Sequence, residues 1–227
     1  MVCAAIMPQC AVIKIISNIN SLFMAKIVIA GGTGNLGQKL TQAFLDRGDQ
    51  VLILSRQDKP SDHPNLQFMK WDGEQLDSWR QHLEKSSVLI NLSGLSINRI
   101  FNKKNQALLR NSRIIPTTLL GRAIQQLANP PKLWINASGI SVFNNQPGMH
   151  DESSKSYSSD FLATLGKDWE AACLQTETPE TQKVILRISP ILSRTAGMFK
   201  ELYPLAKIGL AGTVGSGKQT VSWMHEQ

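Results

Sequence analysis

The sequence predicts an α/β fold with a doubly wound parallel sheet, and three observations support this class. Short apolar segments alternate with longer segments of helical periodicity from residue 25 onwards, which is the order of strands and helices in a parallel sheet. The apolar segments do not alternate with polar residues, as expected when helices cover both faces of a sheet. The first of them leads directly into a glycine turn, Gly31–Gly37, which is typical of the first crossover in such a sheet.

Glycine residues mark the boundaries of the first elements. The strand Ala25–Ala30 ends at the glycine turn, and the helix Leu36–Arg47 ends at Gly48, a residue that commonly terminates helices. The apolar run Gln50–Ser55 forms the second strand. These segments therefore predict one complete strand–helix–strand unit.

The next elements are separated by polar turns. A short strand, Leu66–Lys70, is followed by the turn Trp71–Gly73 and by a helix around Leu76–Lys85. Val88–Leu92 is the fourth strand. Strands and helices thus continue to alternate through this part of the chain.

A long helical segment, Lys104–Leu127, contains Pro116, which we expect to kink or split it because proline removes a helical hydrogen bond. The turn Asn129–Pro131 introduces the fifth strand, Lys132–Ala137. The remaining elements are a polar loop, a helix and the sixth strand, over Asn144–Ser159, Asp160–Gln175 and Val184–Ile188.

The glycine turn predicts a site for a diphosphate. Gly31 permits the sharp turn after the strand, Gly34 lets a pyrophosphate approach the backbone, and Gly37 lets the helix lie close to the sheet. Free N–H groups at the start of that helix would then face an anion. A structural turn in another type of α/β protein is the alternative interpretation.

The residue after the second strand favours NADP(H) over NAD(H). NAD-binding proteins usually place a carboxylate there to hold the ribose hydroxyls, whereas this chain has Arg56. A guanidinium matches the charge and geometry of a 2′-phosphate, although Arg56 could also be an ordinary surface residue. Asp72 could accept a hydrogen bond from the adenine, or it could stabilise its own turn.

Ligands of open parallel sheets bind beyond the carboxyl ends of the strands. The cofactor residues predicted on this basis are Gly31, Thr33, Gly34, Asn35, Leu36, Gly37, Ser55, Arg56, Asp72, Leu92, Ser93 and Gly94.

Composition restricts the class of protein. The chain has 227 residues, 42% of them hydrophobic, and a formal charge of +7, which fits one α/β domain with a substantial core. Its basic residues form no dense run, so we expect no nucleic acid partner, and RNA binding stays the weakest hypothesis. The three cysteines fit reduced thiols in the cytoplasm, and the four scattered histidines predict no metal site.

The character of the two chain ends divides the sequence into three predicted parts. Residues 1–23 are too interrupted by polar residues for a membrane span, and we expect them to be an extension outside the fold, with a cleaved targeting segment as the alternative. Residues 24–190 would form the cofactor-binding domain. Residues 191–227 would form a truncated third part, because the chain stops at Ser222–Gln227, directly after a strand-like run and with no closing element.

Several short motifs carry a family resemblance. They are Gly31–Gly37, Leu54–Arg56, Trp71–Gly73, Asn91–Gly94, Asn111–Arg113, Asn136–Ser138, Phe161–Ala163, Asp168–Glu170, Gly215–Gln219 and Ser222–His225. In this order they resemble an atypical branch of the extended short-chain dehydrogenase/reductases, the NAD-dependent epimerase/dehydratase or nucleoside-diphosphate-sugar epimerase family. The resemblance implies a Rossmann domain with a smaller C-terminal substrate-binding part, of which residues 191–227 would be the incomplete start.

The resemblance also identifies candidate catalytic residues. Ser138 occupies the strand end where the superfamily has a Ser or Thr, and we expect it to bind a substrate hydroxyl or carbonyl. The superfamily's Tyr-x-x-x-Lys pair is missing, because the matching helix begins Phe161–Leu165. Two further matches are misleading: Tyr203–Lys207 lies too late in the fold, with Pro204 restricting it to a helix start, and Gly212–Lys218 resembles a P-loop but is followed by Gln219 and a strand-like segment, Thr220–Trp223.

Two functional hypotheses follow. The first is an NADP(H)-dependent epimerase or oxidoreductase acting on a small molecule such as a nucleotide sugar, with no membrane partner and with a homodimer as one option. Arg99, Lys103, Lys104 and Arg113 could meet an anionic substrate or form a solvated helix face. The second is a cofactor-binding regulatory module that has lost its proton-transfer pair.

Overall fold

The computed structural model describes residues 4–5, 24–143, 148–193, 197–210, 212–213, 215–217 and 220–225. Within these residues a parallel sheet has the strand order β1-β7-β6-β5-β2-β3-β4, and a second small sheet pairs β8 with β9. The strands of the large sheet are β1 Ala4–Ala5, β2 Lys26–Ala30, β3 Gln50–Ser55, β4 Leu66–Lys70, β5 Val88–Asn91, β6 Leu133–Gly139 and β7 Gln182–Ile188. All six predicted strands are therefore confirmed, with the predicted α/β class.

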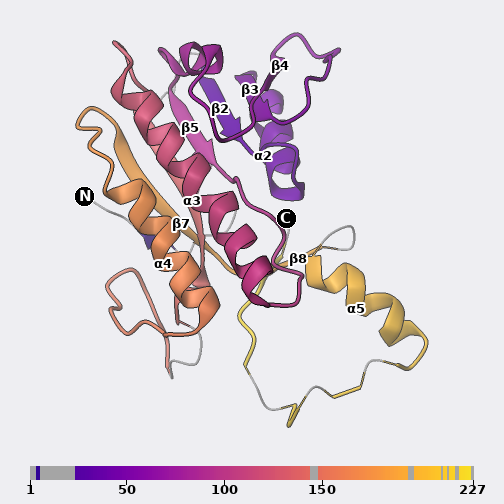
Figure 1. Cartoon of the computed structure of the whole chain (residues 1–227). Coiled ribbons are helices and arrows are strands. Elements are labelled where there is room, and N and C mark those ends of the chain that lie inside the picture. The colour runs from indigo at the N-terminus through magenta and orange to yellow at the C-terminus, as the bar shows by residue number, and fades with distance from the viewer. Residues whose placement is uncertain are drawn as a thin grey trace.

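The other elements connect or follow these strands (Figure 1). They are α2 Asn35–Asp46, the 3₁₀ helices η1 Ser78–Leu83 and η2 Ile140–Phe143, α3 Lys103–Gln125, α4 Phe161–Leu174, α5 Gly197–Lys207, and the strands β8 Ile191–Leu192 and β9 Met224–His225. None of the described helices is both long and apolar enough to span a bilayer.

The chain changes direction across the sheet at β2. From β2 it moves outward through β3 and β4, and it then returns to place β5 on the other side of β2. Ala30, the last residue of β2, is consequently paired with Leu54 on β3 and with Asn91 on β5. This is the strand order of a Rossmann fold, in which ligands bind where the order reverses.

Apolar side chains cover both faces of the sheet, as the sequence predicts. On one face Leu40 and Phe44 of α2 pack against Ile29 and its neighbours on adjacent strands. On the other face η1, α3 and α4 contribute Trp79, Leu120 and other buried residues. Figure 1 shows α3 and α4 running alongside each other over that face. The sheet is thereby buried between helical layers, which fixes the positions of its strand ends.

Of the two effects expected of Pro116 on the long helix, the split is wrong, because α3 continues through it, and the kink stays a prediction. Pro116 is buried, and a Cβ added to Gly73 would come within 3.3 Å of its Cβ. Leu109 and Leu120 are fully buried before and after it. Burial on both sides offsets the loss of one helical hydrogen bond, which costs about 3 kcal/mol.

The predicted helix around Leu76–Lys85 is a shorter 3₁₀ helix. It begins at Ser78, whose N–H donates to Asp77, and it ends before Lys85, which has a φ of +57°. The Trp79 indole donates to the carbonyl of Gln75 at 2.9 Å and fixes the first turn.

Two expectations for the C-terminal region are also wrong. Pro204 lies inside α5 rather than at a helix start, and the strand there is Met224–His225 rather than Thr220–Trp223. Gly215 and Gly217 both have positive φ, as a turn requires, while residues 214 and 218–219 of the P-loop-like segment lie outside the described residues.

The predicted extension is described only at Ala4–Ala5, which pair with Ile185 and Leu186 of β7. The rest of residues 1–23 lies outside the described residues. The polar loop is described over residues 148–159, which contain no helix or strand, and residues 144–147 lie outside the description.

Candidate cofactor-binding site

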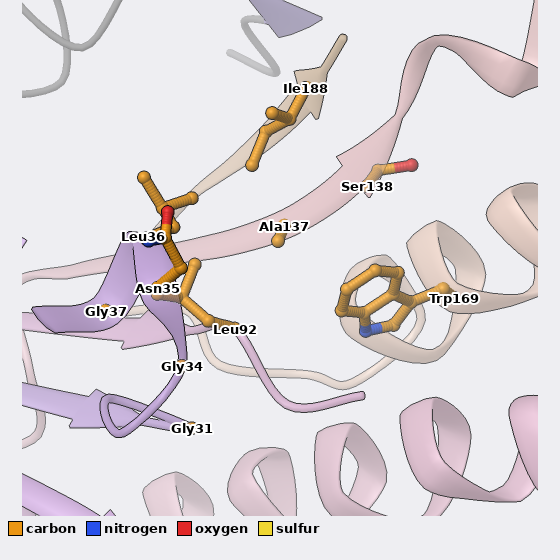
Figure 2. A pocket seen from close by; sticks show the side chains of 10 residues that line it. All are labelled: Gly31, Gly34, Asn35, Leu36, Gly37, Leu92, Ala137, Ser138, Trp169 and Ile188. Carbon is orange, nitrogen blue, oxygen red and sulfur yellow. The ribbon is translucent and has the colours of Figure 1, made fainter. Parts of the chain in front are cut away.

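A cleft of about 280 Å³ lies at the carboxyl ends of β2, β5 and β6, where the strand order reverses. Figure 2 shows the residues that line it: Gly31, Gly34, Asn35, Leu36, Gly37, Leu92, Ala137, Ser138, Trp169 and Ile188. The glycine turn forms one end of the cleft, and Ser138 and Trp169 lie toward the other. The structure therefore brings seven of the sequence-predicted residues together.

Two glycines of the turn are required by the protein's own packing. Gly31 has a φ of +78°, and a Cβ on it would come within 2.9 Å of the Leu92 carbonyl oxygen. A Cβ on Gly37 would come within 2.6 Å of Gly32. Gly34 differs, because the nearest atom to a Cβ there is 3.6 Å away. The space beside Gly34 is thus open to a ligand.

The start of α2 offers the cleft backbone donors that have no acceptor among the described residues. Gly34 is the N-cap residue and has no side chain with which to cap the helix, and no acidic residue lies in the first turn. The following residues, Asn35, Leu36 and Gly37, all line the cleft. Thr33 is exposed beside them, and its carbonyl accepts a hydrogen bond from Gln38. An anion at this position would be stabilised by the free amides and the helix dipole.

A buried hydrogen-bond network shapes the end of β5. The Asn91 side chain donates to Thr117 at 2.8 Å and to Asn136 at 2.7 Å, and its own oxygen accepts from the Ser93 N–H. Trp169 donates to the same Thr117 hydroxyl at 2.9 Å. The network therefore fixes the indole of Trp169, which lines the cleft.

The Ser93 hydroxyl stands out within this region. It is buried and has no hydrogen-bond partner among the described residues. Buried polar groups are almost always satisfied, so this hydroxyl requires a partner, although Ser93 itself is not among the residues that line the cleft. Ser93 and Gly94 directly follow the cleft residue Leu92, and a Cβ on Gly94 would come within 3.0 Å of the Arg113 guanidinium. The absence of a side chain on Gly94, just after β5, therefore leaves room for the Arg113 guanidinium.

Ser138 is held by a buried ion pair. Its hydroxyl donates to Glu170 at 2.7 Å, and Arg187 donates to both carboxylate oxygens of Glu170 at 2.8 Å. Ser138 and Arg187 are paired residues of neighbouring strands, and Glu170 comes from α4. The hydrogen bonds from Arg187 to Glu170 raise the pKa of the guanidinium above its ordinary value.

Aromatic rings complete the surroundings of Arg187. Its guanidinium lies 5.1 Å from the centre of the Phe143 ring and 5.5 Å from that of Tyr157. The Phe143 ring also stacks on His150. These contacts attach the polar loop to the end of the sheet, because Tyr157 and His150 belong to that loop.

Six predicted residues lie outside the set that lines the cleft: Thr33, Ser93 and Gly94, described above, and Ser55, Arg56 and Asp72. Ser55 is buried and exchanges hydrogen bonds with the backbone of Gln57, while Arg56 is exposed. The exposed Asp72 accepts N–H bonds from Glu74 and then Gln75, which lower the pKa of its carboxyl group. The turn-stabilising role that the sequence allowed for Asp72 is therefore present.

Arg113 is the most buried of the basic residues expected near the fourth strand. Its guanidinium donates to the carbonyls of Leu95 and Leu109 and lies 5.1 Å from the Trp169 ring. Burial lowers the pKa of Arg113 to about 10. The other three, Arg99, Lys103 and Lys104, are exposed.

Sequence reasoning missed several residues of the site. Ala137, Trp169 and Ile188 line the cleft, and Glu170 and Arg187 hold Ser138. Two indications were present. The motifs Asn136–Ser138 and Asp168–Glu170 contain three of these residues, and Arg187 interrupts an otherwise apolar strand, where a buried charge requires a partner. No group of three or more potential metal ligands occurs among the described residues.

The Tyr-x-x-x-Lys pair is absent from its usual helix. Phe161 begins α4, and Lys167 donates to the backbone of Ser158 rather than lining the cleft. Tyr203 and Lys207 both lie on α5, where the ammonium is 5.3 Å from the ring centre. Neither residue is among those that line the cleft.

Comparisons with known proteins agree with this architecture. Residues 27–163 match the model of the NAD dependent epimerase/dehydratase family. An epimerase family protein from Staphylococcus saprophyticus is 30% identical over 205 residues, which are 89% of this chain and 67% of the relative.

Two solved structures are similar in fold and sequence. The crystal structure of the human epimerase family protein SDR39U1 with NADPH has a TM-score of 0.73 and 32% identity, covering 88% of this chain and 65% of its own. The nucleoside-diphosphate sugar epimerase from Corynebacterium glutamicum has a TM-score of 0.72 and 26% identity, covering 94% and 44% respectively. The chain thus spans about two thirds of the human and staphylococcal relatives.

Proposed function

Because this chain belongs to the NAD dependent epimerase/dehydratase family, we propose that it binds NADP(H) in the cleft between β2 and β5 and acts on a small substrate carrying a hydroxyl or carbonyl group. Residues 24–190 form the cofactor-binding domain in this proposal, and residues 191–227 begin the substrate-binding part. The uncapped N-terminus of α2 beside Gly34 is the observation that carries the proposal. A relative of 32% identity was crystallised with NADPH, which supports the same class of cofactor here.

The residues present fit such a cofactor. Asn35, Leu36 and Gly37 would hold its diphosphate through their backbone amides. The orphaned Ser93 hydroxyl would hydrogen-bond to it. Arg56 is exposed and forms no ion pair with the described residues, so its guanidinium is free to bind a 2′-phosphate.

A bound nicotinamide would supply a hydride donor or acceptor. The chain's own groups bind and orient the substrate: Ser138 offers a fixed polar atom, and Leu92, Trp169 and Ile188 line the cleft with apolar surface. Apolar walls exclude water and strengthen the polar contacts that remain. A nucleotide sugar is the substrate class that we favour, because a relative of 26% identity is a nucleoside-diphosphate sugar epimerase.

A regulatory module that binds the cofactor without turnover is the second candidate. The observation that favours it is the sequence of α4, which begins at Phe161 and contains no tyrosine, so the helix cannot supply the Tyr-x-x-x-Lys pair. Such a module would retain the glycine turn and Arg56, because these bind the cofactor rather than move a proton.

Fluorescence titration of the full chain with NADPH and NADH tests the shared part of both candidates. We expect saturable binding with preference for NADPH, and absence of binding would contradict the proposal. A turnover assay with NADP⁺ or NADPH across nucleotide sugars and carbonyl compounds then separates them: turnover supports the enzyme, and binding without turnover supports the module.

The proposal includes a cytoplasmic protein, in keeping with the free thiol of Cys173. A homodimer is part of the same proposal and is measured by sedimentation of the full chain. Cell fractionation tests the compartment, and recovery with secreted proteins would contradict it.

A further inference from the structure

The proton of the Ser138 hydroxyl is already committed within the protein. Ser138 lies 2.7 Å from Oε1 of Glu170, and that carboxylate also accepts two hydrogen bonds from Arg187 at 2.8 Å. An ionised carboxylate only accepts hydrogen bonds, so the hydroxyl must be the donor in the contact with Ser138. The hydroxyl can then offer a ligand its lone pairs but no proton.

The ionised state of Glu170 follows from its surroundings. Arg187 forms a two-point contact with the carboxylate, and both side chains are buried. Buried charges require such pairing, and charge-assisted two-point contacts are the strong form of it. Removal of either partner alone would strand the other charge inside the protein.

The surrounding backbone holds this arrangement in place. Ser138 and Arg187 are register partners on β6 and β7, so their side chains start from adjacent positions. Gly166 lets α4 pack closely on η2, because a Cβ there would come within 2.8 Å of Val142, and the same Cβ would lie 3.7 Å from the Ser138 hydroxyl. Figure 2 shows the Ser138 oxygen directed away from the glycine turn, at the end of the cleft where a substrate would lie beyond the cofactor.

We propose that Glu170 and Arg187 are positioning residues that hold Ser138 as a hydrogen-bond acceptor, so that the cleft selects a substrate hydroxyl over the corresponding carbonyl. This inference rests on the proposed function, since it concerns the substrate end of the same cleft. A substrate hydroxyl donates its proton to the Ser138 oxygen. A substrate carbonyl has no proton to donate, so its oxygen lone pairs would meet the lone pairs of the Ser138 oxygen. A site built for a hydroxyl rejects the analogue that lacks the donor.

A matched pair of probes tests the inference on the full chain. Cyclohexanol and cyclohexanone differ in the group that Ser138 would contact, and both are small enough for a cleft of about 280 Å³. Their dissociation constants are measured by saturation-transfer NMR, with and without NADPH. We expect the wild-type protein to bind the alcohol about threefold to tenfold more tightly, the range of one neutral hydrogen bond.

Two variants separate positioning from mere stability. Ser138→Ala should abolish the preference, because it removes the acceptor. The double variant Glu170→Met with Arg187→Met removes both charges together, which avoids a stranded charge, and it frees the Ser138 proton to donate to a ketone. The ratio of the two constants should then fall to about one or reverse, while thermal unfolding reports whether the variant is folded.

The control is a second ion pair that also involves a residue of α4. Arg110 and Asp168 join α3 to α4 at 3.0 Å, and Arg110→Gln with Asp168→Asn should leave the alcohol preference unchanged. The inference is overturned if the wild-type protein binds neither probe, shows no preference or prefers the ketone, or if Ser138→Ala keeps the wild-type ratio. The NADPH titration is read separately, so failure of cofactor binding with an intact alcohol preference would contradict only the proposed function.

Discussion

Gly37 of α2 lies directly against Gly32 in the preceding turn, so that a Cβ on Gly37 would stand 2.6 Å from the Gly32 Cα and carbonyl oxygen. The helix can therefore start this close to β2 only with glycine at position 37. Gly34, three residues earlier, has room for a methyl group and an ordinary extended backbone. The two glycines thus have different roles, one in the fold and one beside the cleft.

Gly37→Ala should lower the free energy of unfolding by about 1–3 kcal/mol, because backbone atoms must move to admit the methyl group. Gly34→Ala is the matched control. It should leave the unfolding midpoint in urea near that of the wild type and weaken NADPH binding at least about tenfold, since one lost close contact costs on the order of 1.4 kcal/mol. Wild-type NADPH affinity in folded Gly34→Ala protein would contradict the placement of the diphosphate.

Arg56→Ala should remove the preference for NADPH. One charge-assisted contact to the 2′-phosphate contributes about 1.5–3 kcal/mol, so NADPH binding should weaken by roughly tenfold to a hundredfold while NADH binding stays unchanged. Arg122→Ala provides the control, because Arg122 is exposed near the far end of α3. An equal loss of both coenzymes would show that Arg56 does not read the phosphate.

Thr117→Val should lower the free energy of unfolding strongly for a single substitution. The Thr117 hydroxyl accepts from both Asn91 and Trp169, and valine would leave two buried donors unpaired at about 1–3 kcal/mol each. Urea unfolding gives the difference in free energy. Thr118→Val is the control on the next position of α3, which is only partly buried, and it should cost less than about 1 kcal/mol.

Cys173 should make the protein less stable in alkali. Burial raises the pKa of its thiol to about 12 from an ordinary value of 9.0, so between these values the unfolded chain loses a proton that the native chain keeps. The contribution of the neutral Cys173 thiol to the free energy of unfolding is fully present below pH 9, and it falls by about 1.4 kcal/mol per pH unit above that pH. Between pH 8 and pH 10, Cys173→Ala should lose about 1.4 kcal/mol less unfolding free energy than the wild type, and parallel losses would contradict the assignment.

The large sheet could be predicted from sequence because its causes are local. Each predicted strand is an apolar run ended by a turn, and the glycines after Ala30 identify the crossover at which the site forms. The predicted split at Pro116 failed because burial of the neighbouring turns of α3 depends on helices and strands far away in the chain. Tertiary packing there outweighs a local preference.

The cleft was predicted at its glycine end and incompletely at its far end. Gly31 and Gly34 follow a spacing that can be read along the chain. Glu170 and Arg187 become neighbours of Ser138 only because β7 lies beside β6 and α4 brings Glu170 against both strands. Spacing along the sequence contains no information about that register.

The position of β2 between β5 and β3, inside the sheet, has a consequence for the order of folding. The pairing of β2 with β3 joins residues close in the chain, such as Lys26 and Gln50, which are separated by one helix. The pairing of β2 with β5 joins residues much further apart, such as Ile27 and Val88. Closing the longer loop costs more chain entropy. We therefore expect β2, β3 and β4 to acquire amide protection first in pulse-labelled hydrogen exchange. The cleft would then exist only after β5 and β6 have joined β2.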